Sequence, residues 1–276
     1  FRALGVDHRG PWFIDLYAIL ASAEAYARGL DPYTFNPLDL FGRAHVYTRW
    51  WLWLGQIGLT RADCIWLGRV LVAAFMGVAL FRLRPRSLGE VAWTLAVLLS
   101  PPFLLALNRA NNDLVIFLLL APVVPCLNAE RVWIRWLAPV FIGAAFTLKT
   151  YPLVAGLLLL ALRDGRELRR LLWVSGAVFL ALLPDVLRDF AVYGPRVPES
   201  HGLMTFGGSL GFVELGCPSA VARLAGVVCG AGVFTAWLKL NPFAGWRIAP
   251  EDRATWWGFV LGATLLTGCF FSGVSF

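Results

Sequence analysis

The amino-acid sequence predicts an all-α protein, a polytopic bundle of transmembrane helices. Of its 276 residues, 59% are hydrophobic and only 15% are charged, whereas about a quarter of the residues in a soluble domain are charged. Tryptophan (13 residues) and phenylalanine (20 residues) are abundant, which is typical of chains whose aromatic rings lie among lipid headgroups. Apolar runs close to the length of a membrane span also recur along the chain.

Eight apolar runs are candidates for membrane spans, because a helix needs about 20 apolar residues to cross the hydrocarbon core. Three of the runs are short: Pro122 and Pro125 interrupt one, and residues 149–152 separate the other two. Short or broken helices are tolerated where they line a cavity inside the protein. The expected spans are 64–83, 88–107, 114–127, 136–148, 153–162, 171–187, 217–238 and 255–276.

The basic residues between these runs predict the orientation of the chain. Four basic clusters follow the first, third, fifth and seventh runs, so all four fall on one side if the spans alternate. That side carries twelve Lys/Arg and six Asp/Glu, whereas the rest of the chain carries twelve and eleven; the positive-inside rule makes it cytoplasmic. This distribution accounts for the net charge of +7, and we expect no nucleic-acid partner. The clustered residues are Arg82, Arg84, Arg86, Arg131, Arg135, Arg163, Arg166, Arg169, Arg170, Lys239, Arg247 and Arg253.

The opposite, extracytoplasmic side then receives a long region before the first span. Within residues 1–63, apolar residues recur at helical spacing from Ile14 to Ala25, Arg28 continues the spacing, and Gly29 is a natural helix stop. A second stretch, residues 50–57, has the tryptophan-rich pattern of an amphipathic helix that lies flat at the membrane interface. We therefore expect an extracytoplasmic loop with amphipathic helices over 1–63 and a transmembrane bundle over 64–276.

Several classes of site are excluded by what the sequence lacks. None of the five cysteines forms a C-x-x-C pair, so neither a zinc site nor a disulfide framework is expected. The sequence contains no P-loop, no H-E-x-x-H and no G-x-S-x-G. It has no D-x-D pair of carboxylates either, and we expect no metal and no separate cofactor. Because the chain begins at Phe1 and ends inside an apolar run, we expect further spans outside this sequence.

Carboxylates near the start of the chain are the first candidates for catalysis. Asp7 and Asp15 precede or open the first outer helix, and an outward-facing carboxylate can serve as a general base for an acceptor hydroxyl. An alternative is that Asp15 is an acidic residue favoured by the dipole at a helix N-terminus.

Two polar turns between apolar runs are the next candidates, because ionisable groups near membrane depth are costly. In residues 108–113, Arg109 is suited to hold a phosphate that Asp113 orients, although Asn112 or Asp113 could instead cap the next helix. In the second turn, Lys149 precedes Tyr151 and is suited to a phosphate or diphosphate headgroup. It could also be a lysine that extends along a helix end towards water.

Polar residues after the sixth run allow structural and functional interpretations. Asp185, Arg188 and Asp189 end that run and are expected to form a surface ion pair or a cap. His201 lies in the following loop, 188–216, near Ser209, where it could cover a site, although a single histidine is more often structural.

Four segments, in order along the chain, resemble the GT-C class of integral-membrane glycosyltransferases, in the branch that uses polyprenyl-phosphate sugars and includes mannosyltransferases. The resemblance extends over nearly the whole chain. Asp15 with the following Gly29-Leu30-Asp31-Pro32-Tyr33 is similar to the branch's opening, which carries G-x-D-P-Y. Asn111-Asn112-Asp113 is similar to its G-N-x-D turn, Lys149-Thr150-Tyr151-Pro152 to its K-x-Y-P motif, and Gly208-Ser209-Leu210 to its N-Q-S-L segment.

The resemblance implies a mechanism and a set of site residues. Asp15, or else Asp7, would deprotonate the acceptor hydroxyl, and basic residues would hold the phosphate of the lipid-linked sugar. The implied substrate- and phosphate-binding residues are Arg109, Asn112, Asp113, Lys149, Tyr151, His201 and Ser209.

We therefore expect a glycosyltransferase that moves a mannose-like sugar from a polyprenyl-phosphate donor to a glycan or lipid acceptor. Its expected place is the bacterial inner membrane, in contact with membrane lipid and with its site facing the periplasm or exterior. One alternative is a non-catalytic membrane subunit that uses this scaffold within a larger complex. Another is a lipid or solute transporter, which would need access from both sides of the membrane.

Overall fold

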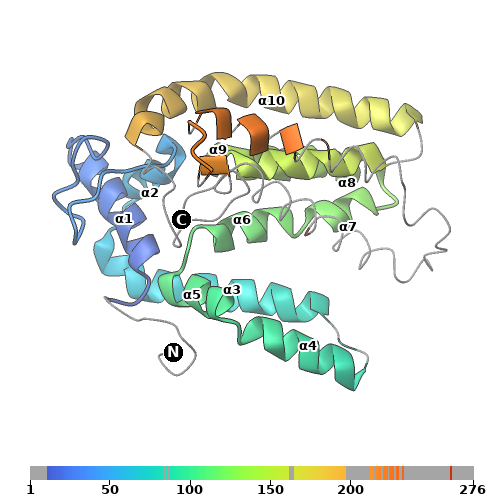
Figure 1. The fold of residues 1–276 in the computed structure, drawn as a ribbon, viewed down its shortest axis with the longest axis horizontal. Coiled ribbons are helices and arrows are strands. Elements are labelled where there is room, and N and C mark those ends of the chain that lie inside the picture. The colour runs from blue at the N-terminus through green and yellow to red at the C-terminus, as the bar shows by residue number, and fades with distance from the viewer. Residues whose placement is uncertain are drawn as a thin grey trace. The chain divides into compact units, whose positions relative to one another are not determined.

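The computed structural model describes residues 11–83, 85, 87–161 and 165–196, with scattered positions between 212 and 262. Every regular element in the described part is a helix (Figure 1). The chain divides into two compact units. The first comprises Phe1–Pro122, Thr147–Lys149 and Leu182–Arg196, and the second comprises Val123–Phe146, Thr150–Ala181 and Val197–Phe276.

The first helix, α1, spans Ile14–Ala27 and confirms the helix expected from the sequence. Gly29 follows the C-cap residue Arg28 and has a φ of 78°, which is easily adopted only by a residue without a side chain. The amide of Leu30 donates to the carbonyl of Ala25, and that of Gly29 donates to Tyr26. These two bonds form a Schellman motif, which satisfies carbonyls that the end of a helix would leave unpaired.

The amphipathic character expected for this helix is wrong. From Ile19 to Ala25 every residue of α1 is buried, which covers nearly two full turns of the helix. Its neighbours in the first unit enclose it, including α2 (Trp53–Gln56), which lies alongside it, and α3 (Cys64–Leu83) (Figure 1). The apolar spacing correctly predicted a helix but did not show that protein covers its polar side as well.

The second expected stretch, 50–57, forms a 3₁₀ turn, η2 (Arg49–Leu52), that continues into α2. Trp51 and Leu52 are buried, whereas Trp53 and Ile57 are exposed. The stretch is therefore helical, with some of its apolar side chains against the protein and others exposed; its position at a membrane interface stays a prediction.

Two helices of the described chain are long and apolar enough to cross a membrane: residues Arg61–Phe81 and Gly165–Arg196. The first joins the short turn η3 (Arg61–Asp63) to α3, and the second contains α10 (Gly165–Tyr193) and η5 (Gly194–Arg196).

The expected span 88–107 is not one straight helix. It consists of α4 (Leu88–Leu98) and α5 (Pro101–Arg109), with a bend of 48° between them. Two consecutive prolines open α5. Proline has no backbone N–H, so it is tolerated in the first turn of a helix but interrupts the backbone hydrogen bonds in a helix interior. If the bent pair counts as one span, the described residues contain three candidates rather than two.

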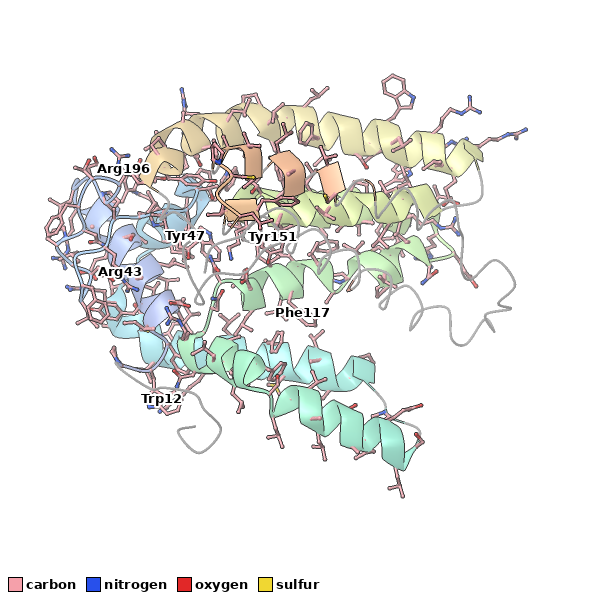
Figure 2. The ribbon with its side chains drawn as sticks, viewed as in Figure 1. Trp12, Arg43, Tyr47, Phe117, Tyr151 and Arg196 are labelled. Carbon is pink, nitrogen blue, oxygen red and sulfur yellow. The ribbon has the colours of Figure 1, made fainter. Side chains whose placement is uncertain are left out.

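The remaining apolar runs form shorter elements. In the first unit, α6 (Asp113–Leu120) runs beside α3, where the rings of Phe75 and Phe117 are 4.7 Å apart (Figure 2 labels Phe117). After the unit boundary at Pro122 come α7 (Val123–Leu127), α8 (Val132–Arg135), α9 (Leu137–Leu148) and η4 (Tyr151–Ala161). The expected spans 217–238 and 255–276 lie outside the continuously described residues.

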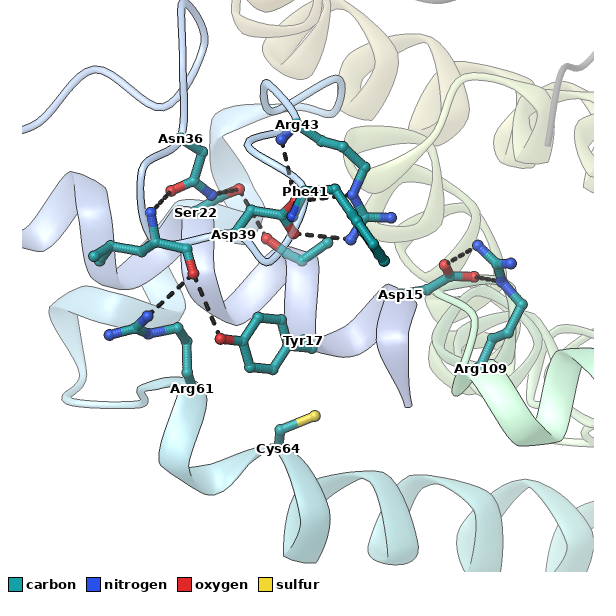
Figure 3. Close-up of polar contacts among 12 residues, drawn as sticks. Asp15, Tyr17, Ser22, Asn36, Asp39, Phe41, Arg43, Arg61, Cys64 and Arg109 are labelled. Atoms are coloured by element: carbon teal, nitrogen blue, oxygen red, sulfur yellow. Dashed lines mark hydrogen bonds and ion pairs between the residues drawn. The ribbon is translucent and has the colours of Figure 1, made fainter. Parts of the chain in front are cut away.

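Buried polar side chains hold the segment between α1 and η2 in place (Figure 3). Asn36 is fully buried and donates to the hydroxyl of Ser22 at 3.1 Å. The carbonyl of Leu38 accepts a hydrogen bond from Arg61 at 3.1 Å, and Arg61 also binds Glu24 of α1. Burial of Glu24 opposes its ionisation, but the hydrogen bonds from Arg61 outweigh this and lower its pKa. The segment between α1 and η2 is thus fixed to the first turn of the Arg61–Phe81 helix.

His45 is buried in this segment between two tyrosine rings. Its ring centroid lies 5.2 Å from that of Tyr33 and 5.7 Å from that of Tyr47, and its Nε2 is 3.3 Å from the carbonyl of Thr48. Burial lowers the pKa of His45 to about 4 because the apolar surroundings disfavour the charged imidazolium. The histidine therefore packs as a neutral group at physiological pH.

Replacement of Gly55 by alanine is expected to destabilise the first unit by about 1–3 kcal/mol, the usual cost of overpacking. A Cβ at Gly55 would lie 2.1 Å from the carbonyl oxygen of Ala23, so α2 would have to move away from α1. Gly77→Ala in α3 is the matched control, because a Cβ there meets no atom within 4 Å. The midpoint of thermal unfolding in detergent is measured for both variants. Equal midpoints for Gly55→Ala and Gly77→Ala would contradict the close approach of α2 to α1.

The stability of the protein is expected to fall as the pH drops from about 6.5 to about 4. In this window the unfolded His45 takes up a proton, while the buried imidazole does not, so acid favours unfolding. His45→Gln should lack this component, which we expect to be roughly 2–3 kcal/mol. Unfolding measured for both proteins across pH 4–7.5 tests this, and parallel pH profiles would show that His45 does not titrate in this way.

Candidate functional site

Asp15, the base predicted from the sequence, lies in the first turn of α1 and forms a bidentate ion pair with Arg109 at the end of α5. Arg109 Nε donates to Asp15 Oδ2 at 2.9 Å, and Arg109 Nη2 donates to Asp15 Oδ1 at 2.6 Å (Figure 3). The side chain of Asp15 is 15% exposed and that of Arg109 is 40% exposed. The carboxylate is therefore largely enclosed, whereas the guanidinium remains accessible.

Asn111 connects this ion pair to the start of α6. Its Nδ2 donates to Asp15 Oδ2 at 3.2 Å, while its Oδ1 accepts from the backbone N–H of Asp113 at 2.9 Å. Asn112 is the N-cap residue of α6, as one alternative expected, but its side chain makes no capping hydrogen bond, and the side chain of Asn111 binds the first amide instead. Ala110 allows the chain to turn here, with a left-handed φ of 44°.

Lys149, at the end of α9, extends the network through Asp113. Its Nζ lies 2.6 Å from Asp113 Oδ1, and both side chains are half-buried. Four residues proposed from sequence, which come from α1, α5, α6 and the end of α9, thus belong to one connected polar cluster within the first unit. We call Asp15, Arg109, Asn111, Asp113 and Lys149 the carboxylate–cation cluster.

The backbone before Asp15 is anchored independently of these side chains. Phe13 has a left-handed φ of 63°, and its N–H donates to the carbonyl of Asn108 at 2.9 Å. Its carbonyl accepts a contact from Cys64 Sγ at 3.6 Å. Its ring lies against Gly68, where an added Cβ would come within 2.3 Å of a ring carbon. The start of α1 is therefore locked to both α3 and α5.

Tyr47 is a candidate site residue that the sequence analysis did not propose. Burial, together with the negative charges of Asp15 and Asp113, raises the pKa of Tyr47 to about 12, although the positive charges of Arg43 and Arg109 act in the opposite direction. The phenol is thus a protonated, half-buried group in the electrostatic field of the cluster; Figure 2 labels it together with Arg43. A signal was present in the sequence, since Tyr47 follows a glycine- and proline-rich segment that precedes the first span.

Two further proposed residues, Asn112 and Tyr151, lie in the described part of the chain. Asn112 is 3% exposed, and its Nδ2 has no hydrogen-bond partner among the described residues. Tyr151 opens η4 and belongs to the second unit. Asp7, His201 and Ser209 lie outside the described residues.

The acidic residues near the end of α10 form an ion pair different from the one expected. Arg49 binds both Asp185 and Asp189, and its backbone N–H donates to Asp189 Oδ2 at 2.8 Å. Asp189 is buried rather than on the surface. These carboxylates therefore attach η2 to α10 within the first unit, a structural role that the sequence could not reveal because the partners are 136 and 140 residues apart.

Chemically, the carboxylate–cation cluster offers two carboxylates that can accept a proton, Asp15 and Asp113, and two cations that can hold an anion, Arg109 and Lys149. Comparison of the chain with protein-family models, with curated proteins and with solved structures finds no match. Any function must therefore be argued from the chemistry of the cluster and the resemblance of the motifs. Among the described residues, no group of three or more His, Cys, Asp or Glu could hold a metal ion.

The Asp15–Arg109 pair is expected to show a coupling free energy of about 1–2 kcal/mol, because it is two-pronged and half-buried. A double-mutant cycle with Asp15→Asn, Arg109→Gln and the double variant isolates this energy from the cost of each substitution alone. Equilibrium unfolding in mixed micelles provides the four free energies. Strictly additive substitutions would mean that the two side chains are not coupled.

Proposed function

We propose that the protein is a membrane glycosyltransferase that moves a sugar from a polyprenyl-phosphate donor to an acceptor hydroxyl. The observation that carries this proposal is the connection of Asp15, Arg109 and Lys149 in one cluster. Glycosyl transfer from a lipid phosphate needs a base and cations for the leaving group. The cluster contains both, on segments that lie far apart in the sequence.

In the proposed reaction, Asp15 accepts the proton of the acceptor hydroxyl as its oxygen attacks the anomeric carbon of the sugar. The bond from that carbon to the phosphate oxygen breaks, and its electron pair stays on the phosphate. The leaving group is then a polyprenyl monophosphate with one more negative charge than the donor phosphate carried. Arg109 and Lys149 stabilise this developing charge, which is a main source of catalysis in such transfers.

The remaining residues implied by the resemblance have supporting roles in this proposal. Asp113 orients Lys149 through their ion pair. Asn112, Tyr151, His201 and Ser209 contribute to substrate binding. The two helices long enough to cross a membrane would hold a lipid-linked donor at the correct depth. The proposed location is the bacterial inner membrane, with the cluster facing the exterior and a glycan or lipid as acceptor.

One structural observation favours a second candidate, a non-catalytic subunit of a membrane complex. Both cations of the cluster are already bound to carboxylates, Arg109 to Asp15 and Lys149 to Asp113. In a subunit of this kind the ion pairs would serve only to hold α1 against α5 and α6. A transporter is supported by no comparable observation.

The test is transfer of radiolabelled sugar from a polyprenyl-phosphate donor in membranes that contain the full-length protein. Asp15→Asn preserves the size of the side chain but removes the base, and we expect transfer to fall by about 10²- to 10⁴-fold. Asp185→Asn is the control, since it removes a carboxylate from the same unit outside the cluster.

Three results separate the candidates. A large loss in Asp15→Asn alone, with the protein inserted and folded, supports the glycosyltransferase and its base. Transfer that Asp15→Asn leaves unchanged would move the role of base to Asp7. No transfer by the wild-type protein, across a panel of lipid-linked sugars, would favour the non-catalytic subunit.

A further inference from the structure

The observed cluster presents an obstacle to catalysis, because Asp15 is occupied. Oδ1 accepts from Arg109 Nη2, and Oδ2 accepts from both Arg109 Nε and Asn111 Nδ2. Both oxygens of Asp15 are therefore bound by the same cation, and an acceptor hydroxyl has to compete with the guanidinium for either of them. For Asp15 to act as a base, at least the guanidinium must be displaced.

The exposure of the two partners indicates what could displace it. Arg109 is 40% exposed, compared with 15% for Asp15, so an incoming ligand meets the guanidinium before the carboxylate. Two of the five N–H groups of the guanidinium bind Asp15, and a planar guanidinium binds phosphate in the same two-pronged way as carboxylate. An anionic phosphate is therefore a direct competitor of Asp15 for Arg109.

We propose that the Asp15–Arg109 pair is the donor-free state of the site, and that the donor phosphate releases Asp15 by taking over Arg109. This inference rests on the proposed function and adds to it the order in which the two substrates act. The donor binds first, and only then is the carboxylate free to take the acceptor proton. The exchange conserves ion pairs, since Arg109 leaves one anion for another.

Asn111 has a distinct role in this exchange, as a positioning residue. After Arg109 leaves, its Nδ2 still donates to Asp15 Oδ2, and its Oδ1 is fixed by the N–H of Asp113. One carboxylate oxygen then remains held, while Oδ1 becomes free to accept a proton.

The exchange makes an unusual prediction: removal of the charge of Asp15 should improve binding of a lipid phosphate. In the wild-type protein the phosphate must displace Asp15, whereas in Asp15→Asn it need not. We expect Asp15→Asn to bind a short isoprenyl monophosphate about tenfold more tightly than the wild type does. Binding is measured on the full-length protein in nanodiscs, with the dephosphorylated isoprenol and inorganic phosphate as separate ligands.

The controls separate this effect from a general change in charge. Glu167→Gln frees Arg135 from a comparable half-buried ion pair in the second unit and should leave affinity unchanged. Adding Arg109→Gln to Asp15→Asn should abolish the gain. A gain with inorganic phosphate as well as with the lipid locates recognition in the phosphate group, whereas a gain with the lipid alone shows that the tail is also needed. Isoprenol binding should not change.

A second measurement uses the unmodified protein, in case Asp15→Asn does not fold. A water-soluble carbodiimide reacts with accessible carboxyl groups, and mass spectrometry locates the modified residues. The isoprenyl monophosphate should increase labelling of Asp15 several-fold, while isoprenol should not. Labelling of Asp15 that is indifferent to the phosphate would overturn the exchange.

The outcomes distinguish this inference from the proposed function. Equal or weaker phosphate binding by Asp15→Asn, together with sugar transfer by the wild type, would overturn the exchange and leave the glycosyltransferase intact. Tighter binding without any transfer by the wild type would support the phosphate exchange and remove sugar transfer from the proposal.

Discussion

The first unit depends on one constraint: the charged residues at the ends of its apolar helices must find partners of opposite charge. An isolated charge close to the apolar part of a membrane is costly, and here each pair joins a segment near the start of the chain to another helix. Glu24 of α1 binds Arg61 at the start of the Arg61–Phe81 helix, and Asp15 of α1 binds Arg109 at the end of α5. The same pairing attaches Arg49 to α10. The described residues before α3 are therefore a structured part of the first unit rather than a linker.

Charge pairing also explains how α1 can be buried on all sides. An enclosed helix must satisfy every polar group it carries, and α1 carries Glu24, which is only 6% exposed. Arg61 and Arg28 satisfy that carboxylate, while Ser22 donates to the carbonyl of Ala18 and accepts from Asn36. With those groups paired, the apolar and small residues of α1 can pack against several elements at once.

The sequence could predict the helices and the polar residues at their ends, because both depend on local patterns. Helical spacing and Gly29 placed α1 almost to the residue, and the cost of charge near the membrane identified Asp15, Arg109 and Lys149. It could not predict that Asp15 and Arg109 bind each other across 94 residues, since such pairing depends on how the helices pack. For the same reason it missed the enclosure of α1, the bend between α4 and α5, and the connecting role of Asn111.

Whether the cluster is a scaffold or a site depends on what holds Asp15 in position. If its ion pair with Arg109 were the main anchor, release of Arg109 would let α1 move and the base would be lost. The structure anchors this point by other means. Phe13, in a left-handed conformation that costs about 1–2 kcal/mol in a residue with a side chain, is held by Asn108 and packed against Gly68. This cost is sustained only because the surrounding packing determines the backbone, so the carboxylate of Asp15 would keep its place when its cation leaves, as a base must.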